Sequence, residues 1–391
     1  MKNENWKTVR LGDLISKADI IRNKSQNYPI LSMTMHEGLI FQKDRFSKQI
    51  ASIDRSNYLV VKRNQLVQSF PIDEGVLDIN RVSDLGIVSP AYKIWNINET
   101  QIYGEYLVKV LRCEKSLSFY KQKLKGTTAR RRTISDADFL GMQIPLPPLE
   151  EQKHIAAVLD KCSALIAKQK RMLEKYDTLV KSQFVEMFGD PYSNPMNWER
   201  KTFKEVAVRL SDGPFGSNLK SEHYSSSGIR VIRLGNIGVN EFLDADKAFI
   251  PLNHYETLKK YTCKAGEIVI GTMGVPNLRA CIIPDKIPIS INKADCVHYI
   301  PKPELLDTRF VCQYINCPET LLLASSMIHG QTRTRVSSGQ IAEMPISIPP
   351  LALQEKFAAF VQAVDAQKAK AQKSLDKAET LYKALMQEYF G

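Results

Sequence analysis

Two glycine-hinged segments of the chain concentrate arginine and hydroxyl side chains. TTARRRTIS follows Gly126, and QTRTRVS follows Gly330. Guanidinium and hydroxyl groups bind phosphate oxygens and the acceptor atoms of guanine. Because the combination recurs at two matching places, it favours nucleic-acid contact over an ordinary solvated charge run. The candidate contacts in and beside these segments are Lys125, Thr128, Arg130, Arg131, Arg132, Thr332, Arg333 and Arg335.

Other polar loops and strand edges supply weaker candidates for the same chemistry. SDGPFGSNLKSEHY, from Ser211, and GTMGVPNLRA, from Gly271, contain glycines that permit close backbone approach to a ligand. Arginines at strand edges are often merely solvated, and this alternative stays open for each of them. The further candidate DNA contacts are Ser32, Thr34, His36, Lys43, Arg45, Ser217, Asn218, Lys220, Arg230, Arg233, Asn277 and Arg279.

The charge of the whole chain also favours a polyanionic partner. Over 391 residues, 54 Lys and Arg stand against 42 Asp and Glu, which gives a formal net charge of +12. Such a surplus is typical of proteins that bind nucleic acid or an acidic membrane, although it also aids solubility. No stretch approaches the roughly 20 apolar residues of a membrane span, and the N-terminus has no apolar signal core. We expect a cytoplasmic protein that binds nucleic acid and no membrane.

Motifs for a catalytic or metal centre are missing from the sequence. It contains no GxxxxGK[ST] phosphate loop, and its six histidines do not fall into HExxH or another ligand spacing. The seven cysteines include no CxxC pair, so buried thiols in a reducing compartment explain them better than a zinc site. We expect no catalytic residue, no metal and no cofactor bound by this chain.

An internal repeat of the whole chain determines where the candidate residues lie. When Pro148 is aligned with Pro350, the copies stay in register without a gap to Gly189 and Gly391. Before each proline pair, the repeat extends back through a basic segment, two short helices and a β-rich region that begins near a tryptophan. One structural unit is therefore used twice.

The region between each tryptophan and the short helices is rich in predicted strands. YPILSMT, NYLVVKRNQLVQSF and AYKIWNI show the pattern in the first copy, and IRVIRL, EIVIGTM, ACIIP and DCVHYIP in the second. We predict an α+β fold with β-rich domains at 1–143 and 191–345. Long helical segments are predicted at 144–190 and 346–391.

Each long helical segment starts at a proline pair and ends at a glycine. Proline suits the first helical position, where its missing N–H would be unpaired anyway. About 40 residues give a helix of about 60 Å, which one small domain cannot bury. Apolar residues recur at spacings of three and four, which predicts a coiled-coil seam between the helices. The predicted packing residues are Leu159, Ile166, Leu173, Val180, Val361, Val364, Leu375, Tyr382 and Leu385.

The first long helix has more apolar surface than one seam needs. Ile155, Val158, Leu165, Met172 and Leu179 widen its apolar face. A helix with such a face packs on its own domain or docks onto another protein, and the sequence leaves both alternatives open. Packing of each helix on its own domain only is likewise the alternative to a mutual pair.

The order of these features resembles the specificity subunits of type I restriction-modification systems. The resemblance covers the whole chain and rests on IPLPPLEEQKHIAAVLD, the later MFGDP, and the second copy PPLALQEKF. The second copy departs at Ala352-Leu353, where the first has Glu150-Glu151, but it keeps Gln354. The resemblance implies two target recognition domains that each read half of an asymmetric, bipartite site in double-stranded DNA. The two long helices would form an antiparallel coiled-coil spacer between these domains.

The resemblance also implies a non-catalytic role and a set of partners. Two methyltransferase subunits that bind S-adenosylmethionine would assemble on the chain, together with motor-nuclease subunits that use ATP and Mg. The residues themselves leave two other interpretations open. One is a stand-alone DNA-modifying enzyme with an unrecognised catalytic site, and the other is a coiled-coil adaptor that binds only proteins.

Overall fold

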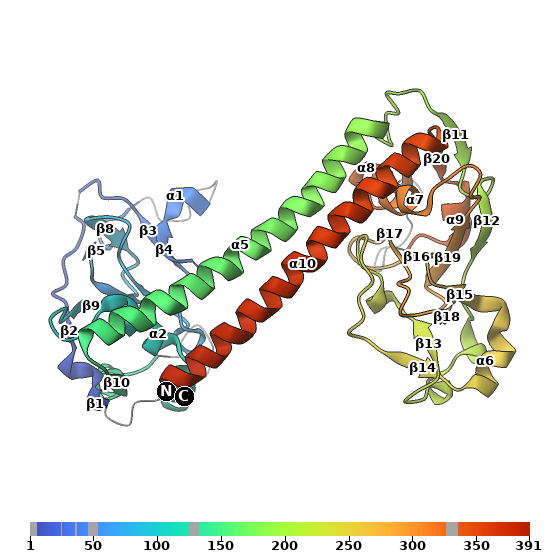
Figure 1. The fold of residues 1–391 in the computed structure, drawn as a ribbon. Helices are drawn as coiled ribbons and strands as arrows, with labels where there is room; N and C mark the ends of the chain where they lie inside the picture. The colour runs from blue at the N-terminus through green and yellow to red at the C-terminus, as the bar shows by residue number, and fades with distance from the viewer. Residues whose placement is uncertain (1–5, 25, 36, 46–53, 125–132, 326–334) are drawn as a thin grey trace. The chain divides into compact units, whose positions relative to one another are not determined.

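The chain divides into two compact units, each with one β-rich domain and part of each long helix. The structure, a computed structural model, describes residues 6–24, 26–35, 37–45, 54–124, 133–325 and 335–391. Unit 1 comprises Met1–Lys170 and Lys373–Gly391, and unit 2 comprises Arg171–Gln372. Figure 1 shows the path of the chain through these elements.

Unit 1 is built from small antiparallel sheets and short helices. Its strands are β1 (Lys7–Arg10), β2 (Ile15–Lys17), β3 (Leu31–Thr34), β4 (Gly38–Phe41), β5 (Leu59–Lys62), β6 (Leu66–Gln68), β7 (Leu77–Ile79), β8 (Leu85–Val88), β9 (Lys93–Ile97) and β10 (Gln143–Leu146). Its short helices are α1 (Gln42–Arg45), α2 (Gly104–Arg112), α3 (Glu114–Lys123) and α4 (Asp136–Leu140), with 3-10 turns η1 (Leu11–Asp13) and η2 (Ile72–Glu74). The largest sheet has the order β2-β9-β6-β7, while β1 pairs with β10, β3 with β4, and β5 with β8.

Unit 2 repeats this plan and adds a second four-stranded sheet. Its strands are β11 (Glu199–Thr202), β12 (Ala207–Ser211), β13 (Ile229–Ile232), β14 (Ala248–Ile250), β15 (Thr262–Lys264), β16 (Ile268–Gly271), β17 (Arg279–Ile282), β18 (Ile289–Asn292), β19 (Cys296–Pro301) and β20 (Pro345–Ile348). Its short helices are α6 (Leu252–Leu258), α7 (Thr308–Ile315), α8 (Pro318–Ser325) and α9 (Ser338–Glu343), with 3-10 turns η4 (Gly216–Asn218), η5 (Ser221–His223), η6 (Leu234–Asn236) and η7 (Lys259–Tyr261). The sheets run β12-β19-β16-β17 and β14-β13-β18-β15, and β11 pairs with β20.

The strand orders show that the two units are copies of one fold. The sheet orders are β2-β9-β6-β7 in unit 1 and β12-β19-β16-β17 in unit 2. In each sheet, the hairpin β6–β7 or β16–β17 forms one edge, and β2 or β12 forms the other. Two short helices, α2 and α3 or α7 and α8, follow β9 or β19 in the chain. The predicted α+β repeat is therefore confirmed, including the short helix pairs.

The long helices are α5 (Leu149–Phe188) and α10 (Leu351–Phe390), each of 40 residues. The Pro148 carbonyl accepts the Gln152 backbone N–H at 3.0 Å, and the Pro350 carbonyl accepts that of Gln354 at 3.3 Å. Each proline thus occupies the N-cap position, one residue earlier than predicted, because its carbonyl already accepts an intrahelical bond. At the other end of α5, Gly189 adopts a left-handed φ of 78°, as expected of a helix stop.

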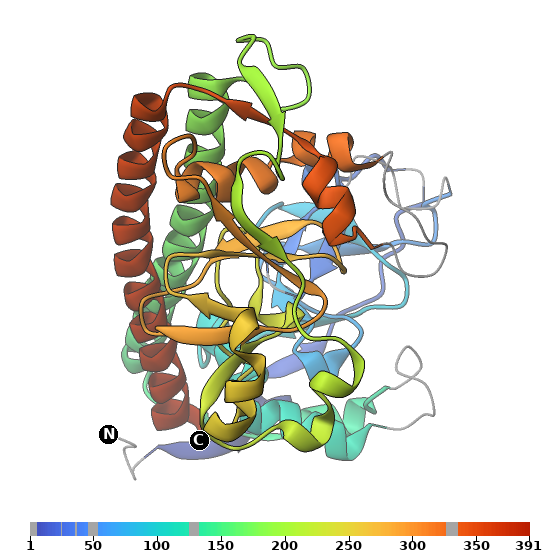
Figure 2. The ribbon, with the colours of Figure 1, turned by 90° about the vertical axis from the view of Figure 1, so that its right-hand side faces the viewer.

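The two long helices pack in antiparallel fashion within each unit. In unit 1, Lys170 Nζ of α5 lies 2.9 Å from Glu379 Oε1 of α10. In unit 2, Asp177 Oδ1 of α5 lies 2.7 Å from Lys368 Nζ of α10. Later positions of α5 therefore meet earlier positions of α10, and both views show the helix segments side by side (Figures 1 and 2). The alternative in which each helix packs only on its own domain is wrong.

The predicted seam residues lie on the packed faces. Leu159, Val364 and Leu375 are buried. The remaining predicted positions are half-buried: Ile166, Leu173, Val180, Val361, Tyr382 and Leu385. None of the predicted positions is solvent-exposed, so this part of the coiled-coil prediction is confirmed.

Aromatic packing at one end of the helix pair was not predicted. In unit 2, the ring centroids of Phe184 and Phe357 lie 5.5 Å apart, and those of Phe188 and Phe310 lie 4.8 Å apart. These rings join α5, α10 and α7 in one core. Phe184 and Phe188 are absent from the predicted packing residues, which end at Val180 in the first long helix.

Candidate nucleic-acid interface

Three loops of unit 2 converge beside the place where the second basic segment ends. The segments are 211–220, 272–278 and 335–338. The Val336 backbone N–H donates to the Thr272 carbonyl at 3.1 Å. The Ser338 hydroxyl binds the Asp212 carboxylate, which brings the first segment to the same place. Since Arg335 belongs to the second basic segment, this loop cluster is the candidate interface of unit 2.

The loop at 211–220 presents the most accessible predicted contacts. Ser217, Asn218 and Lys220 are exposed. The loop enters this region through Gly213, where an added Cβ would lie 2.2 Å from the Asn292 carbonyl oxygen, so only glycine fits. The Asn218 carbonyl is bonded to His254 Nε2 at 3.0 Å, which fixes the far side of the loop. These polar side chains are thus displayed on an anchored backbone.

Two predicted DNA contacts, one on β13 and one directly after it, are engaged within the protein instead. Arg230 is only 6% exposed, and its Nη2 donates to Asp244 Oδ1 at 2.9 Å and to the Asp246 carbonyl at 2.7 Å. Arg233 is partly exposed and pairs with the Asp246 carboxylate. The hydrogen bond and charge of Lys286 lower the pKa of Asp244. The predicted surface position of Arg230 is therefore wrong, because the arginine neutralises and orders an acidic loop.

Arg279 has a structural role and is not a free surface cation. Its Nε donates to the Ile237 carbonyl at 2.6 Å, and its Nη2 donates to the Leu234 carbonyl at 3.0 Å. Its Nη1 donates to the carbonyls of Met273 at 2.5 Å and Pro276 at 3.0 Å. A guanidinium group that binds four carbonyls has little donor capacity left for DNA. This corrects the predicted role of Arg279, which holds the β16–β17 loop in one shape.

Arg335 remains available at the rim of the loop cluster. Its side chain is 39% exposed and lies 3.6 Å from Asp295 Oδ1, a loose ion pair. Asn277, on the β16–β17 loop, is half-buried. A loose, partly exposed pair of this kind contributes little to stability, so Arg335 can exchange its carboxylate partner for phosphate.

In unit 1, the described candidates lie on or near the β3–β4 hairpin. Thr34 is buried, and its hydroxyl donates to the Gly38 carbonyl and accepts from the Glu37 N–H, each at 3.0 Å. Its predicted surface role is therefore wrong, because the hydroxyl closes the hairpin turn. Ser32 is half-buried on β3, and Lys43 is exposed, with Nζ 5.6 Å from the centre of the Phe41 ring.

Most residues of the two basic segments lie outside the part of the chain that the structure describes. The following predicted contacts lie outside the described residues or have undescribed side chains: His36, Arg45, Lys125, Thr128, Arg130, Arg131, Arg132, Thr332 and Arg333. Their assignment stays a prediction. Ile134 and Arg335, near the C-terminal ends of these segments, show where the chain rejoins each domain.

A pair of glutamines in the proline motifs joins each long helix to its domain. Gln152 Oε1 accepts from the Tyr103 N–H at 2.7 Å, and its Nε2 donates to the carbonyls of Pro147 and Gln101 at 2.8 and 3.1 Å. Gln354 makes the matching bonds to the Asp307 N–H at 2.9 Å, and to the Pro349 and Leu305 carbonyls at 2.8 and 3.0 Å. Both side chains are fully buried.

These glutamines explain the repeated motif, and sequence reasoning did not assign them this role. The alignment had already paired Gln152 with Gln354, while flanking residues differ between the copies. The signal that could have revealed this role is that both copies have glutamine at the same position, although the residues around it differ. Two of the three partners of each glutamine could not have been named, since they lie 47 to 51 residues earlier in the chain.

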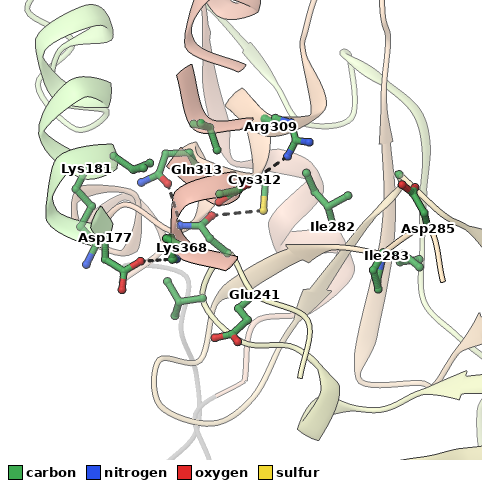
Figure 3. A pocket seen from close by; sticks show the side chains of 17 residues that line it. Asp177, Lys181, Glu241, Ile282, Ile283, Asp285, Arg309, Cys312, Gln313 and Lys368 are labelled. Atoms are coloured by element: carbon green, nitrogen blue, oxygen red, sulfur yellow. Dashed lines mark hydrogen bonds and ion pairs between the residues drawn. The ribbon is translucent and has the colours of Figure 1, made fainter. Parts of the chain in front are cut away.

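A cavity of about 630 Å³ lies within unit 2, where the long helices meet the second domain. Figure 3 shows Asp177 and Lys181 of α5, Lys368 of α10, and Arg309 and Gln313 of α7 around it. Carboxylates and cations alternate on its walls, and Arg309 Nη1 lies 3.6 Å from Asp365 Oδ2 of α10. The lining does not have the single-sign charge that a polyanion needs. This cavity is therefore separate from the candidate nucleic-acid interface.

Comparison with known proteins identifies the family. The sequence profile described as "Type I restriction modification DNA specificity domain" matches residues 3–175 and 195–379, one match for each copy of the repeat. The chain belongs to this family. As a type I DNA specificity subunit with two recognition domains, it is the specificity component of a multi-subunit system and not its catalytic subunit. The predicted resemblance is confirmed.

Individual relatives agree with the family. The MjaVIII specificity subunit of Methanocaldococcus jannaschii is 22% identical over 390 residues, covering 93% of this chain and 86% of the relative. The putative MjaX specificity subunit of the same organism is 23% identical, covering 68% and 63%. Among solved structures, the type I S subunit from M. genitalium is similar in fold, with a TM-score of 0.57, 15% identity, and coverage of 100% and 97%. A structure from work on assembly of a type I system has a TM-score of 0.54 at 16% identity, with coverage of 100% and 98%.

Three further observations complete the description of this specificity subunit. Among the described residues, no group of three or more His, Cys, Asp or Glu side chains is placed to hold a metal ion. Within the same part of the chain, no helix is both long enough and apolar enough to cross a lipid bilayer. All seven cysteines are buried and unpaired.

Proposed function

We propose that this specificity subunit reads a bipartite, asymmetric DNA site, with one half-site for each recognition domain. The observation that carries the proposal is the repetition of one fold with the same central strand order and different loops. Unit 2 has the loop at 211–220 and the sheet β14-β13-β18-β15 beside its candidate interface. Unit 1 has the β3–β4 hairpin instead. Readers with different loop residues select different bases, so the half-sites differ in sequence.

The gap between the half-sites would be determined by the helix pair. Half-sites that two readers contact from one face of a duplex lie about one helical turn, roughly 34 Å, apart or slightly more. A flexible linker would allow many spacings. The two 40-residue helices are paired, and the buried Gln152 and Gln354 side chains bond them to their domains. Such a helix pair suits a fixed spacing between the half-sites. In this proposal, helix length determines the number of base pairs that are not read.

The partners would be two methyltransferase subunits and the motor-nuclease subunits. In this proposal S-adenosylmethionine, ATP and Mg are bound by those partners, and this chain contributes the DNA specificity. Exposed apolar side chains on α5 support docking of another protein: Leu165 is 41%, Leu179 44% and Val185 45% exposed. Unpaired thiols throughout support a reducing compartment, which favours the cytoplasm.

A binding selection would test the proposal. The chain, assembled with its methyltransferase partners, would select from random duplexes at two salt concentrations. We expect enrichment of two different short half-sites at one fixed spacing, with affinity that falls steeply as salt rises, because phosphate contacts release counterions. Weak, salt-insensitive binding without sequence preference would contradict the proposal and favour a protein-only adaptor.

A further inference from the structure

Val275 is the most exposed large apolar residue that the structure describes. Its side chain is 100% exposed at the tip of the β16–β17 loop. Single exposed apolar residues are common on protein surfaces and need no special explanation. The position of this one is informative, because Met273 forms a β-bridge with Arg335, which belongs to the second basic segment. Val275 therefore stands within the candidate interface of unit 2.

Hydrogen bonds from the Arg279 side chain fix the backbone that carries Val275. Arg279 Nη1 bonds the carbonyls of Met273 and Pro276, one on each side of the tip, at 2.5 and 3.0 Å. The same guanidinium group ties the loop to the carbonyls of Leu234 and Ile237. The loop is thus ordered by internal bonds, while its valine makes no contribution to the core. A preorganised tip loses little conformational freedom when it binds.

Unit 1 presents an apolar residue at the equivalent place. The β6–β7 loop corresponds to the β16–β17 loop by strand order, and it carries Phe70-Pro71 where unit 2 has Val275-Pro276. Phe70 is 37% exposed. It lines a small pocket together with Thr133 and Ile134, near the C-terminal end of the first basic segment. Both units therefore place a partly or fully exposed apolar side chain, followed by proline, beside the end of an arginine-rich segment.

We propose that Phe70 and Val275 determine specificity by apolar contact with the C5-methyl group of thymine, one in each half-site. Arginine and hydroxyl groups nearby would bind phosphates and guanine, whereas these side chains have no hydrogen-bonding group. In the major groove, the thymine methyl is the base-edge feature that an apolar side chain recognises. The inference rests on the proposed recognition of two half-sites and adds the residue that reads one base in each.

The test uses the chain assembled with its methyltransferase partners and duplexes that carry the selected site. Each thymine is replaced in turn by deoxyuridine, which lacks only the C5-methyl group. For the unaltered complex, we expect a loss of about fivefold in affinity at one thymine of each half-site, the effect of one buried methyl group. Val275→Ala should show a similar loss on the unmodified site and become insensitive to deoxyuridine in one half-site only. Phe70→Ala should do the same in the other half-site.

A matched control separates this effect from general damage. Val208 is 63% exposed on β12, at the opposite edge of the same sheet, so Val208→Ala should keep the full response to deoxyuridine. If Val275→Ala weakens binding equally at every duplex, or leaves the deoxyuridine response intact, the inference is wrong. A sequence-selective complex that tolerates deoxyuridine at every thymine would also overturn it and leave the proposed function standing. An unaltered complex without sequence preference would contradict the proposed function itself.

Discussion

At the residue scale, the buried glutamines are the clearest link between sequence motif and architecture. Gln354→Leu keeps the side-chain volume but leaves the Asp307 N–H and the Leu305 and Pro349 carbonyls without their partner. Buried polar groups left unpaired cost about 1–3 kcal/mol each, so we expect a loss of at least that size in the free energy of unfolding. Urea unfolding would measure it, with exposed Gln362→Leu on the same helix as the control. Equal effects of the two substitutions would contradict this role for Gln354.

The thiols give a second prediction at this scale. Burial raises the pKa of Cys281, Cys296 and Cys317 to about 12. Because the thiolate is the reactive species, these cysteines should react slowly with a thiol reagent at pH 8 in the folded chain. In strong denaturant, all seven should react rapidly. Rapid labelling of any of these three in the folded chain would show that its surroundings open readily.

The arginines show why residue-level sequence reasoning reached only part of the interface. Arg230, Arg279 and Arg335 have the same chemistry, and the sequence offered the same interpretation for each. Their roles differ because their neighbours differ. Arg230 binds the Asp244 carboxylate, Arg279 binds four backbone carbonyls, and Arg335 forms a loose ion pair with Asp295. Those neighbours are brought together only by the tertiary fold. Val275 was overlooked because an apolar residue in a polar loop carries no hydrogen-bonding chemistry.

At the scale of elements, the helix pair should depend on apolar packing far more than on its ion pairs. Phe357 is fully buried against Phe184 and Phe188, so Phe357→Ala should lower the free energy of unfolding by about 3–5 kcal/mol. Lys170→Ala removes an exposed pair with Glu379, for which we expect less than about 1 kcal/mol. Urea denaturation of the two variants would show the contrast. A comparable effect of both would mean that charge, not packing, holds the helices together.

The elements themselves were largely predictable, and the reason is periodicity. The long helices have an apolar repeat over ten turns with a proline at one end and a glycine at the other, and their predicted seam is buried or half-buried. Short strands such as β14 and β18 carry only three or four residues, too few for alternation to stand out. Their pairing, which includes the parallel contact between β13 and β18, depends on contacts far apart in sequence.

At the scale of the whole molecule, the length of the helix pair should determine the number of unread base pairs between the half-sites. Inserting one helical turn of four residues near Lys168 in α5, with a matching turn opposite it in α10, lengthens the pair by about 6 Å. At 3.4 Å per base pair, the unread gap should grow by about two base pairs while both half-sites stay the same. Sequencing of selected duplexes would report the gap. An unchanged gap would contradict this role of the helix pair, and altered half-sites would indicate damage to the recognition domains.

The central claim is that one chain carries two different readers held at one spacing. The most direct measurement is strand-resolved methylation sequencing of a host that lacks other restriction systems and expresses the chain with its partner subunits. We predict a single bipartite motif, with two unlike half-sites, a fixed unread gap and a methylated base in each half. A continuous motif, a palindromic motif or a variable gap would contradict it.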